Sequence, residues 1–400
     1  MSQDKSVLIT GCGIVSAIGL DCGQVLDSLL SVKTGVGPLK YLRTDHTEFP
    51  VGEVKLSDEE MERMMGIAPG TPTTRTALMG MIALHEALGQ AGLSRDDLRE
   101  CGFVNGTTVG GMDKSEQYYL DFIENDSRNA YISTHDCGSC SEMIADRFGR
   151  FKMITTISTA CSSAANAIEM AADMIRLGEA DIVVAGGSEC ITKFHLNGFN
   201  SLMILDHSQC RPFDAERVGL NLGEGAAFVV LEEAGHAAAR NAKALARLSG
   251  YGNACDAFHQ TASSPDGEGA YLAMSKALKE AGLKPSEIDY VNAHGTGTPN
   301  NDESESQAMM RVFGKDLPPV SSTKSMTGHT TSASGAIETV ICILALKNGF
   351  IPVNYAFEHP MENGMVPNMD LHRGCRLRHV LCNSFGFGGN DSSLVISAVE

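Results

Sequence analysis

The sequence contains no tryptophan and is short of positive charge. It has 31 Lys and Arg residues against 49 Asp and Glu residues, which gives a formal net charge of −18 at pH 7. A protein that binds nucleic acid presents a basic surface, so this balance argues against a nucleic-acid partner. The same charge would repel an acidic protein partner at long range.

Long apolar runs are also missing, and the cysteines are not grouped. No uncharged apolar stretch is long enough to span a bilayer, and residues 1–19 start polar, unlike a secretory signal. Twelve cysteines scattered over 400 residues do not form a disulfide framework. We therefore expect reduced thiols, a cytoplasmic location and no membrane span.

Short β-branched runs alternate with Ala-rich helical stretches along the chain, which is typical of an α/β fold with largely buried strands. Hydrophobic residues make up 43% of the sequence, and its length leaves room for two or three domains. The expected strands are residues 6–10, 102–104, 153–158, 181–186, 226–233, 289–294 and 393–399.

Two pairs of segments indicate an internal duplication. The pattern Ser-Ala-x-x-Ala-Ile-Glu at 163–169 recurs at 332–338, and ALGQAGL at 87–93 resembles ALKEAGL at 277–283. An aromatic-Val-Asn triplet follows each member of the second pair, and both pairs keep the same order. We predict two related α/β halves, with a site where the carboxyl ends of their strands converge.

The first candidate for chemistry is Cys161, at the turn between an apolar β-rich run and a long Ala-rich helix. Unpaired backbone N–H groups at a helix start stabilise a thiolate, so this position suits a nucleophile. Cysteine is also often an ordinary buried residue. The local sequence leaves both alternatives open.

Two further segments carry histidines. His294 ends an apolar strand and precedes a Gly- and Thr-rich loop in which Thr296 and Thr298 could bind a ligand. His329 and Lys324 lie in a small-residue loop before the second copy of the duplicated helix, where His329 falls beside the position that matches Cys161. A histidine at a strand end is often structural, and a lysine is usually solvated, so these alternatives also stay open.

The last candidate segment, residues 383–396, has three glycines around Phe385 and Phe387. This pattern favours a mobile aromatic loop whose backbone N–H groups could hold an oxyanion. A Gly-rich turn before the final strand is the structural alternative.

Together these segments resemble the β-ketoacyl-[acyl-carrier-protein] synthases, type I and II ketosynthases of the thiolase-like superfamily. TACSSA, NAHGTGTP, SSTKSMTGH and NSFGFGG occur in the family's order, and the likeness covers nearly the whole chain. The resemblance implies an α/β fold with the duplicated, five-layer α-β-α-β-α architecture of thiolases. We place the nucleophile in a first half, residues 1–245, and the two histidines in a second half, residues 246–400.

The resemblance also implies a decarboxylative Claisen condensation. An acyl group would be held on Cys161, and His294 and His329 would bond the carbonyl of malonyl-acyl carrier protein as carbon dioxide leaves. The N–H groups of Cys161 and Phe387 would hold the oxyanion, and Phe387 would gate the acyl pocket.

Further roles and partners follow from the same resemblance. Lys324 would support the histidines electrostatically, and Glu338 and Asp302 would order the loops. The expected substrate-binding residues are Thr296, Thr298 and Phe385. Neither a cofactor nor a metal is implied. The partners would be an acyl carrier protein that carries acyl and malonyl groups, and a second subunit that is either an identical copy or a chain-length-factor-like chain.

Two segments depart from the family pattern. Residues 131–149 carry Asp136 and small residues where relatives are more apolar near the acyl pocket, and residues 56–65 are acidic where relatives dock an acidic carrier with basic residues. Both departures favour a specialised ketosynthase of a polyketide or aryl-polyene pathway. General fatty acid elongation remains the alternative.

Other functions are less well supported by the sequence. A catalytically silent chain-length-factor-like subunit typically lacks the nucleophile, and a thiolase that uses coenzyme A would carry a second cysteine at the position of His329. GCGIVSAIG imitates a dinucleotide fingerprint, but no acidic residue follows at the expected distance. Cys137 and Cys140 imitate a redox or zinc pair without a second pair at metal spacing.

Overall fold

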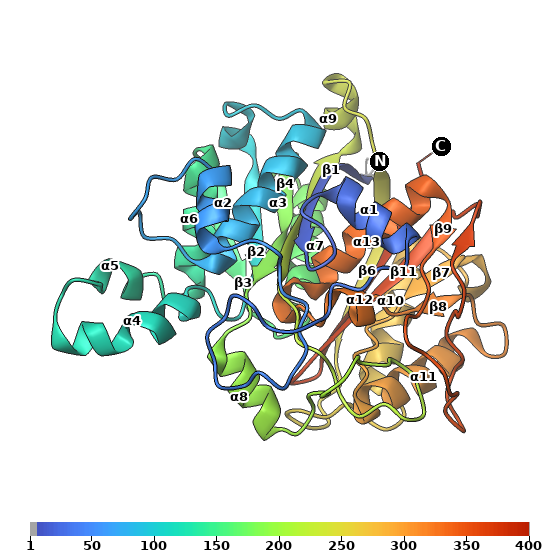
Figure 1. The fold of residues 1–400 in the computed structure, drawn as a ribbon. Coiled ribbons are helices and arrows are strands. Elements are labelled where there is room, and N and C mark those ends of the chain that lie inside the picture. The colour runs from blue at the N-terminus through green and yellow to red at the C-terminus, as the bar shows by residue number, and fades with distance from the viewer. Residues whose placement is uncertain (1–5, 400) are drawn as a thin grey trace.

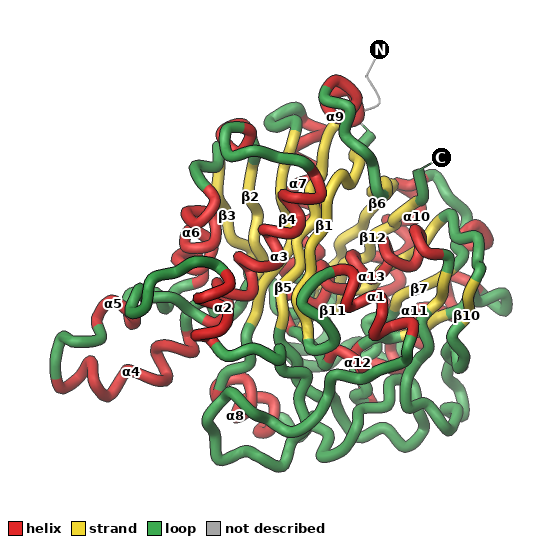
Figure 2. Tube along the Cα trace, turned by 45° about the horizontal axis from the view of Figure 1, so that its top comes forward, coloured by secondary structure: helices red, strands yellow, loops and turns green. Residues whose placement is uncertain are grey.

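The structure, a computed structural model, describes residues 6–399 (Figure 1). Residues 1–5 and residue 400 lie outside the described range. The expectation that residues 1–19 are unlike a secretory signal rested partly on residues 1–5. Ten strands form one sheet in the order β3-β2-β4-β5-β1-β6-β12-β11-β7-β8, and Figure 2 shows most of them side by side. Their bounds are β1 Val7–Ser16, β2 Gly102–Gly106, β3 Met153–Ile157, β4 Ile182–Glu189, β5 Gly225–Glu233, β6 Ala246–Cys255, β7 Tyr290–Asn292, β8 Val320–Ser321, β11 His379–Gly386 and β12 Asn390–Ser397.

The strand order repeats itself from the two edges inward. The first five strands of the chain lie in the order 3-2-4-5-1, and the corresponding strands of the second half lie in the order 8-7-11-12-6. β1 and β6 pair antiparallel at the centre and join the two halves. The predicted duplication is therefore present in the topology. The division at residues 245 and 246 falls just before β6 and stays a proposal.

The helices form three layers: one on the outer face of each half of the sheet and one between the two halves. Their bounds are α1 Cys22–Leu30, α2 Asp58–Met64, α3 Arg75–Ala91, α4 Met112–Glu124, α5 Asn129–Ile132, α6 Cys137–Phe148, α7 Ser163–Leu177, α8 Lys193–Ser201, α9 Ala234–Ala239, α10 Glu268–Ala281, α11 Pro299–Phe313, α12 Lys324–Thr327 and α13 Ser334–Asn348. α3 and α6 pack on the outer face of the first half, and α10 and α11 on that of the second. α7 and α13 lie between the halves. A small hairpin of β9 (Phe350–Ile351) and β10 (His372–Arg373) completes the fold.

The alternation of side chains along the strands builds these layers. In β4, Val183 and Ala185 pack on the central helices, and Ile182 and Val184 pack on the outer ones. Both faces of β4 are buried, so its residues from Ile182 to Gly187 are apolar rather than alternating with polar residues. α13 is buried from Ser334 to Leu346, as a helix in the central layer must be.

The register inferred for the duplicated helix motif is wrong by two residues. α7 begins at Ser163 and ends at a left-handed Gly178, and α13 begins at Ser334 and ends at a left-handed Gly349. Aligning α7 with α13 by their first and last residues gives a register that differs by two positions from the one given by the matched Ser-Ala-x-x-Ala-Ile-Glu patterns. Ala-rich helices resemble one another at several offsets, so the short match selected the wrong one.

Several strands were missed or misjudged from the sequence. β6 was not expected, β8 spans only two residues, and β11 runs through residues 379–386. The segment expected to be a mobile aromatic loop is therefore mostly strand. β11 pairs antiparallel with β12, and only residues 387–389 form the turn between them.

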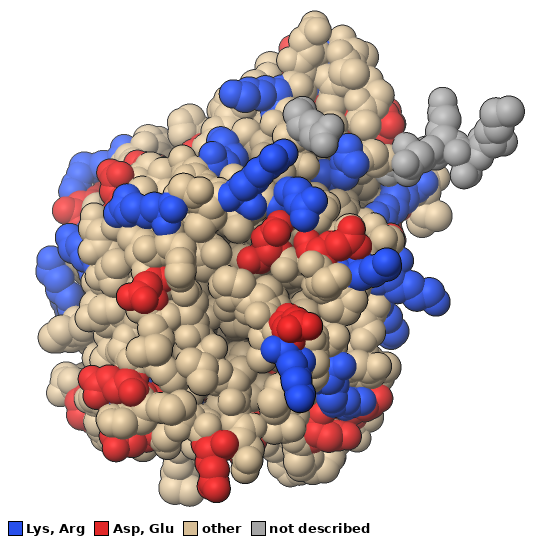
Figure 3. Space-filling view, turned by 90° about the vertical axis from the view of Figure 1, so that its right-hand side faces the viewer, with Lys and Arg blue, Asp and Glu red and all other residues tan. Residues whose placement is uncertain are grey.

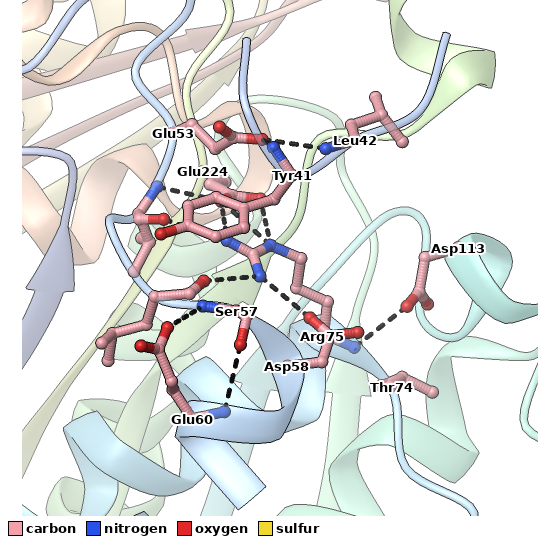
Figure 4. Close-up of polar contacts among 12 residues, drawn as sticks. Tyr41, Leu42, Glu53, Ser57, Asp58, Glu60, Thr74, Arg75, Asp113 and Glu224 are labelled. Carbon is pink, nitrogen blue, oxygen red and sulfur yellow. Dashed lines mark hydrogen bonds and ion pairs between the residues drawn. The ribbon is translucent and has the colours of Figure 1, made fainter.

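A buried ion-pair network ties the first half together (Figure 4). The Arg75 guanidinium lies 2.6 Å from a Glu224 carboxylate oxygen and 2.9 Å from an Asp58 oxygen. Glu224 also accepts a hydrogen bond from the backbone N–H of Val54, and the Lys114 ammonium lies 2.6 Å from Asp58. The network joins α2, α3 and α4 to the segment that leads into β5.

Within residues 6–399 no helix is both long and apolar enough to cross a membrane. In the same range no group of three His, Cys, Asp or Glu side chains is placed to hold a metal ion. All twelve cysteines are free thiols.

We predict that Arg75→Ala lowers the free energy of unfolding by about 3–5 kcal/mol, because it leaves buried carboxylates without their partner. Chemical denaturation followed by circular dichroism measures this change. Arg99→Ala is the matched control: its side chain is 71% exposed and 3.9 Å from Asp96, so its effect should stay within about 0.5 kcal/mol. Equal effects of the two variants would contradict the structural role of the network.

Candidate active site

Cys161 and His329 come from equivalent loops of the two halves. Cys161 follows β3 and His329 follows β8, the edge strands at opposite ends of the sheet. By the bounds of α7 and α13, Ser332 is the equivalent of Cys161. It lies three positions from His329, not beside it as the sequence match suggested.

Both loops hold a residue in the left-handed region. Ala160 has φ 52° and Thr331 has φ 44°, and they occupy the same place before α7 and before α13. Such backbone costs about 1–3 kcal/mol for a residue other than glycine. In both halves, then, the chain turns sharply beside a candidate functional residue.

His329 contacts the sulfur of Cys161 directly. The Nε2 atom of His329 lies 3.2 Å from Cys161 Sγ, and its Nδ1 atom lies 3.1 Å from the Ser334 hydroxyl oxygen. The backbone of His329 is held as well, because its N–H donates to the Asn221 carbonyl and its carbonyl accepts from Gly223. The segment with Asn221 and Gly223 leads into Glu224, and the contact of Glu224 with Arg75, drawn in Figure 4, holds that segment in place.

The loop after β7 is clamped by two acids on α11. Glu305 accepts hydrogen bonds from the backbone N–H groups of His294 (2.9 Å) and Gly295 (2.8 Å). Asp302 accepts from the N–H groups of Thr296 (3.1 Å) and Gly297 (3.2 Å). The two acids are three residues apart and therefore lie on one face of the helix. Burial raises the pKa of Glu305 to about 7.

The His294 ring stands edge-on to the His329 ring, with 5.2 Å between the ring centroids. Burial, and then the nearby Lys324 ammonium, lower the pKa of both histidines well below the ordinary value. Both rings are therefore neutral near pH 7. Among residues 6–399 the buried Nδ1 atom of His294 has no hydrogen-bond partner, which leaves the ring proton free to reside on Nε2.

Lys324 is not a solvated loop charge. It is 1% exposed, and its ammonium forms an ion pair with the Glu338 carboxylate on α13. Burial raises the pKa of Glu338 to about 7, although Lys324 opposes that shift. Neither side chain lines the cavity at Cys161.

The Gly-rich turn after β11 lies against the start of α7. A Cβ atom on Gly386 would come within 3.3 Å of the Cys161 nitrogen. Asn390 Oδ1, at the far side of the turn, accepts hydrogen bonds from Ser162 (2.7 Å) and Asn166 (2.7 Å) on the Cys161 side. These bonds keep the backbone N–H of Phe387 near the sulfur, where it favours the thiolate.

A cavity of about 260 Å³ opens from the surface to Cys161. It brings together most of the side chains expected from the sequence: Cys161, His294, His329, Thr296, Thr298, Phe385 and Phe387. Asp302, Lys324 and Glu338 lie outside its wall. Phe387 stacks on Phe199 of α8, with 5.9 Å between the ring centroids, at the side of the cavity.

The expectation of a resting thiolate is wrong. Burial raises the pKa of the Cys161 thiol to about 11, and the attraction of Lys324 and the N–H of Phe387 offset only part of this. The helix start supplies the N–H groups that the sequence predicted, but loss of hydration outweighs them. The thiol is therefore neutral near pH 7, and a base is needed to ionise it.

Several residues of the site were not expected from the sequence. Glu305 lies three positions after Asp302, Ser334 five after His329, and Asn390 at the end of the Gly-rich turn. A carboxylate at helical spacing from Asp302 was a signal that could have identified Glu305. The other two are recognisable only once the loops are placed in space.

Comparisons with known proteins agree along the whole chain. The family model described as the N-terminal domain of beta-ketoacyl synthase matches residues 4–237, and that of the C-terminal domain matches residues 245–358. Nodulation protein E of Rhizobium meliloti is 34% identical over 99% of this chain and all of its own length. The 3-oxoacyl-[acyl-carrier-protein] synthase 2 of Coxiella burnetii is also 34% identical, over 99% of each chain.

Solved structures share the fold. The ishigamide ketosynthase/chain length factor superposes with a TM-score of 0.91 at 32% identity, covering 99% of this chain and all of that chain. A type II polyketide ketosynthase solved with its acyl-carrier protein gives a TM-score of 0.88 at 27% identity, with complete coverage of both chains. The predicted α/β, thiolase-like fold class is confirmed.

We predict that alkylation of Cys161 accelerates with pH well beyond pH 9. A raised pKa means that the thiolate fraction keeps growing towards pH 11, and the thiolate is the reactive species. Iodoacetamide labelling at a series of pH values, read by peptide mass spectrometry, measures the rate at Cys161. The exposed Cys255 of the same protein serves as the internal reference. A rate that levels off below pH 8 would show that the resting sulfur is already ionised.

Proposed function

The chain belongs to the β-ketoacyl synthase family of condensing acyltransferases, and we propose that Cys161, His294 and His329 are its catalytic residues. One observation carries the proposal. The sulfur of Cys161 lies 3.2 Å from His329 Nε2 at the bottom of a cavity that His294 also lines. A carbonyl carbon bound at the sulfur would therefore lie between two neutral imidazoles and two backbone N–H groups.

In the first half-reaction Cys161 takes an acyl group from a carrier thioester. His329 Nε2 accepts the Sγ proton, the sulfur attacks the carbonyl carbon, and the N–H groups of Cys161 and Phe387 bind the oxyanion. The bond to the carrier sulfur then breaks, and His329 returns the proton to the departing thiolate. The products are acyl-Cys161 and a free carrier thiol.

In the second half-reaction a malonyl thioester loses carbon dioxide. The electron pair of the broken carbon–carbon bond moves into the thioester carbonyl, and hydrogen bonds from His294 and His329 stabilise the enolate oxygen. The enolate carbon attacks acyl-Cys161 and the carbon–sulfur bond breaks. Protonation from solvent restores the thiol. The product is a 3-oxoacyl thioester two carbons longer than the acyl donor.

His329 needs two different tautomers in these steps. It accepts a proton at Nε2 in the first and donates from Nε2 in the second. The hydroxyl of Ser334, 3.1 Å from Nδ1, can either accept or donate a hydrogen bond and therefore fits both tautomers. Burial, reinforced by the positive charge of Lys324, lowers the pKa of both rings and keeps them neutral, and Glu338 balances the Lys324 charge in the buried layer.

The substrate arm and the acyl chain use the remaining cavity residues. Thr296 and Thr298, whose hydroxyl oxygens are 2.9 Å apart, face the arm in this proposal, while Phe385 lies against His294 with 5.8 Å between ring centroids. Phe387 is 37% exposed and stacks on Phe199. Rotation of that ring would open the acyl side of the cavity, which is the gating role proposed for it.

The carrier protein and the pathway are part of the proposal. One solved relative is a ketosynthase with its acyl-carrier protein bound, and another is a ketosynthase/chain length factor. These neighbours support a polyketide-type substrate, whereas the 34% identity to 3-oxoacyl-[acyl-carrier-protein] synthase 2 supports fatty acid elongation. We favour the specialised pathway. The intact mass of the protein after exposure to a mixed pool of acyl carriers identifies the acyl group that Cys161 retains.

A second subunit of the same family is also proposed. β3 is an edge strand, and all five of its residues are partly exposed. Beyond this edge α4 and α5 extend from the body of the protein (Figure 1), with exposed apolar side chains at Tyr119, Leu120, Phe122 and Ile123. An open sheet edge beside an apolar surface is typical of a subunit interface. The free cysteines are in keeping with the proposed cytoplasmic location.

We predict that the catalytic variants fail in different ways. Cys161→Ala should lose acyl transfer and condensation but keep decarboxylation of malonyl-carrier. His294→Ala should keep acylation of Cys161 and lose decarboxylation by about a hundredfold, because one enolate donor is missing. His329→Ala should impair both steps. Intact-protein mass spectrometry measures acylation, and release of labelled carbon dioxide measures decarboxylation.

His372→Ala is the control for these variants, since His372 is exposed on β10, outside the cavity. It should change neither step. Condensation by Cys161→Ala at the wild-type rate would remove Cys161 from the mechanism. An unchanged decarboxylation rate in His294→Ala would remove that histidine.

We predict that Leu120→Asp with Ile123→Asp weakens subunit association, because charges replace apolar contacts at the proposed interface. Light scattering on purified protein, alone and after co-expression with a chain-length-factor-like subunit, measures the mass. Leu177→Asp, an exposed leucine at the end of α7, is the control. A fully active monomer of 42.5 kDa would contradict the proposed second subunit.

A further inference from the structure

Asp391, the second residue of β12, is a buried acid that the proposed mechanism does not use. Most Asp and Glu side chains in folded proteins lie in water, and the red patches on the face drawn in Figure 3 show this arrangement. Asp391 instead is 4% exposed. Among residues 6–399 its carboxyl oxygens have no hydrogen-bond donor. A carboxyl group in this position calls for a physical explanation.

Asp391 lies at the junction of two segments that line the cavity. One is the turn of residues 387–389, which immediately precedes β12 and carries the N–H of Phe387. The other is the loop of residues 256–264, which follows β6. We call them the oxyanion turn and the flanking loop.

Backbone hydrogen bonds join these two segments. The Asp256 N–H donates to the Gly389 carbonyl at 2.8 Å, and the Gly388 N–H donates to the Gln260 carbonyl at 2.8 Å. Both bonds lie next to Phe387 in the sequence. The position of the Phe387 N–H near the sulfur therefore depends on how closely the oxyanion turn lies against the flanking loop.

A second acid lies beside Asp391, across a single glycine. A Cβ atom on Gly269, in the first turn of α10, would come within 2.1 Å of Asp391 Oδ2 and 2.8 Å of Asp256 Cβ. The missing side chain leaves the room that Asp391 occupies. The Asp256 carboxylate accepts hydrogen bonds from the N–H groups of Ser264 (2.6 Å) and Gly269 (3.3 Å), which shape the flanking loop. The two acids therefore meet where the two segments join.

Burial, and then the nearby Asp256 and Glu305 carboxylates, raise the pKa of Asp391 to about 8. Asp391 is therefore neutral at pH 7. Loss of its proton would place a new negative charge close to Asp256, in a site where little water is present to screen the repulsion.

The other charged groups on the elements around Asp391 are engaged elsewhere. On α10, the Glu268 carboxylate lies 2.6 Å from the Arg311 guanidinium, and the Lys276 ammonium donates to a backbone carbonyl of β6 at 2.7 Å. On β11, the residue that pairs with Asp391 is the uncharged Phe385. An ionised Asp391 would therefore gain little from these groups and would be repelled by the neighbouring acids.

We propose that Asp391 is a positioning residue for the oxyanion turn and that it acts through its own protonation state. As a neutral carboxyl it allows the turn to lie against the flanking loop, with the Phe387 N–H near Cys161. As a carboxylate it repels Asp256, separates the two segments and withdraws that N–H from the substrate oxygen. The inference rests on the proposed function, because it requires that this N–H holds the oxyanion.

Asp391→Asn tests the inference, because it removes the titration and keeps the size of the side chain. Acylation of Cys161 by acyl-pantetheine, a donor without a carrier protein, is followed by intact-protein mass spectrometry at pH 7 and pH 9. The wild-type rate divided by the variant rate should fall by about tenfold over this range, because a group with a pKa of about 8 passes from mostly protonated to mostly ionised. The ratio cancels the titration of every group that the two proteins share.

Glu169→Gln is the matched control. Burial raises the pKa of Glu169 to about 8 as well, but Glu169 lies on α7 in the central layer, whereas Asp391 faces α10 in an outer layer. The wild-type rate divided by the Glu169→Gln rate should be the same at pH 7 and pH 9.

Hydrogen exchange separates this positioning role from a purely structural one. Peptides that cover the oxyanion turn and the flanking loop are followed by mass spectrometry, with a correction for the intrinsic effect of pH on exchange. Their amide protection should fall between pH 7 and pH 9 in the wild-type protein and persist in Asp391→Asn, because only the wild-type protein gains the repelling charge.

Three results would overturn the inference: the same pH dependence of acylation in wild type and Asp391→Asn, an equal change of the rate ratio in Glu169→Gln, or unchanged protection of both segments in the wild-type protein at pH 9. Asp391→Ala repeats the test should Asp391→Asn fail to fold. Failure of the wild-type protein to be acylated by acyl-pantetheine at either pH would instead refute the proposed function.

Discussion

The contact between Cys161 Sγ and His329 Nε2 is the constraint on which the site depends. The two side chains are far apart in the sequence and come from different halves of a duplicated fold, yet they lie 3.2 Å apart. Their loops leave equivalent edge strands, β3 and β8, and both turn through a left-handed residue before a central helix. α7 and α13 lie between the halves, so any shift of one half against the other would change this distance.

Burial determines the electrostatics around that contact. The Cys161 thiol and the two imidazoles lose their hydration, which raises the pKa of the thiol and lowers those of the histidines, so all three groups are neutral at rest. Lys324, a buried cation beside these groups, is paired with Glu338. A neutral site suits chemistry in which charge appears only transiently, on a sulfur, an oxyanion or an enolate, because preorganised donors then act where charge develops.

The second level of organisation is the way acidic groups are used. A chain with a net charge of −18 has an excess of carboxylates, and few of them could be buried without a binding partner. Three of the buried acids bind backbone N–H groups or a cation: Glu305 and Asp302 hold the His294 loop, and Glu224 holds Arg75. Much of segment 56–65 is likewise engaged within the protein. Among the described residues, the side chains that line the cavity include no Asp, Glu, Lys or Arg.

The sequence by itself determined the layered α/β class and the duplication, and it made Cys161, His294 and His329 candidates, whose roles only the family resemblance favoured over structural alternatives. Strand-to-helix turns, Gly-rich loops and repeated helix motifs need only a few neighbouring residues to be recognised. Tertiary structure decided the register of the duplicated helices, the strand character of residues 383–386 and the neutral state of the thiol. It also decided the burial of Lys324 and the roles of Glu305, Ser334 and Asn390. These features depend on which segments pack together and how much water they exclude, and neither quantity is contained in a local pattern.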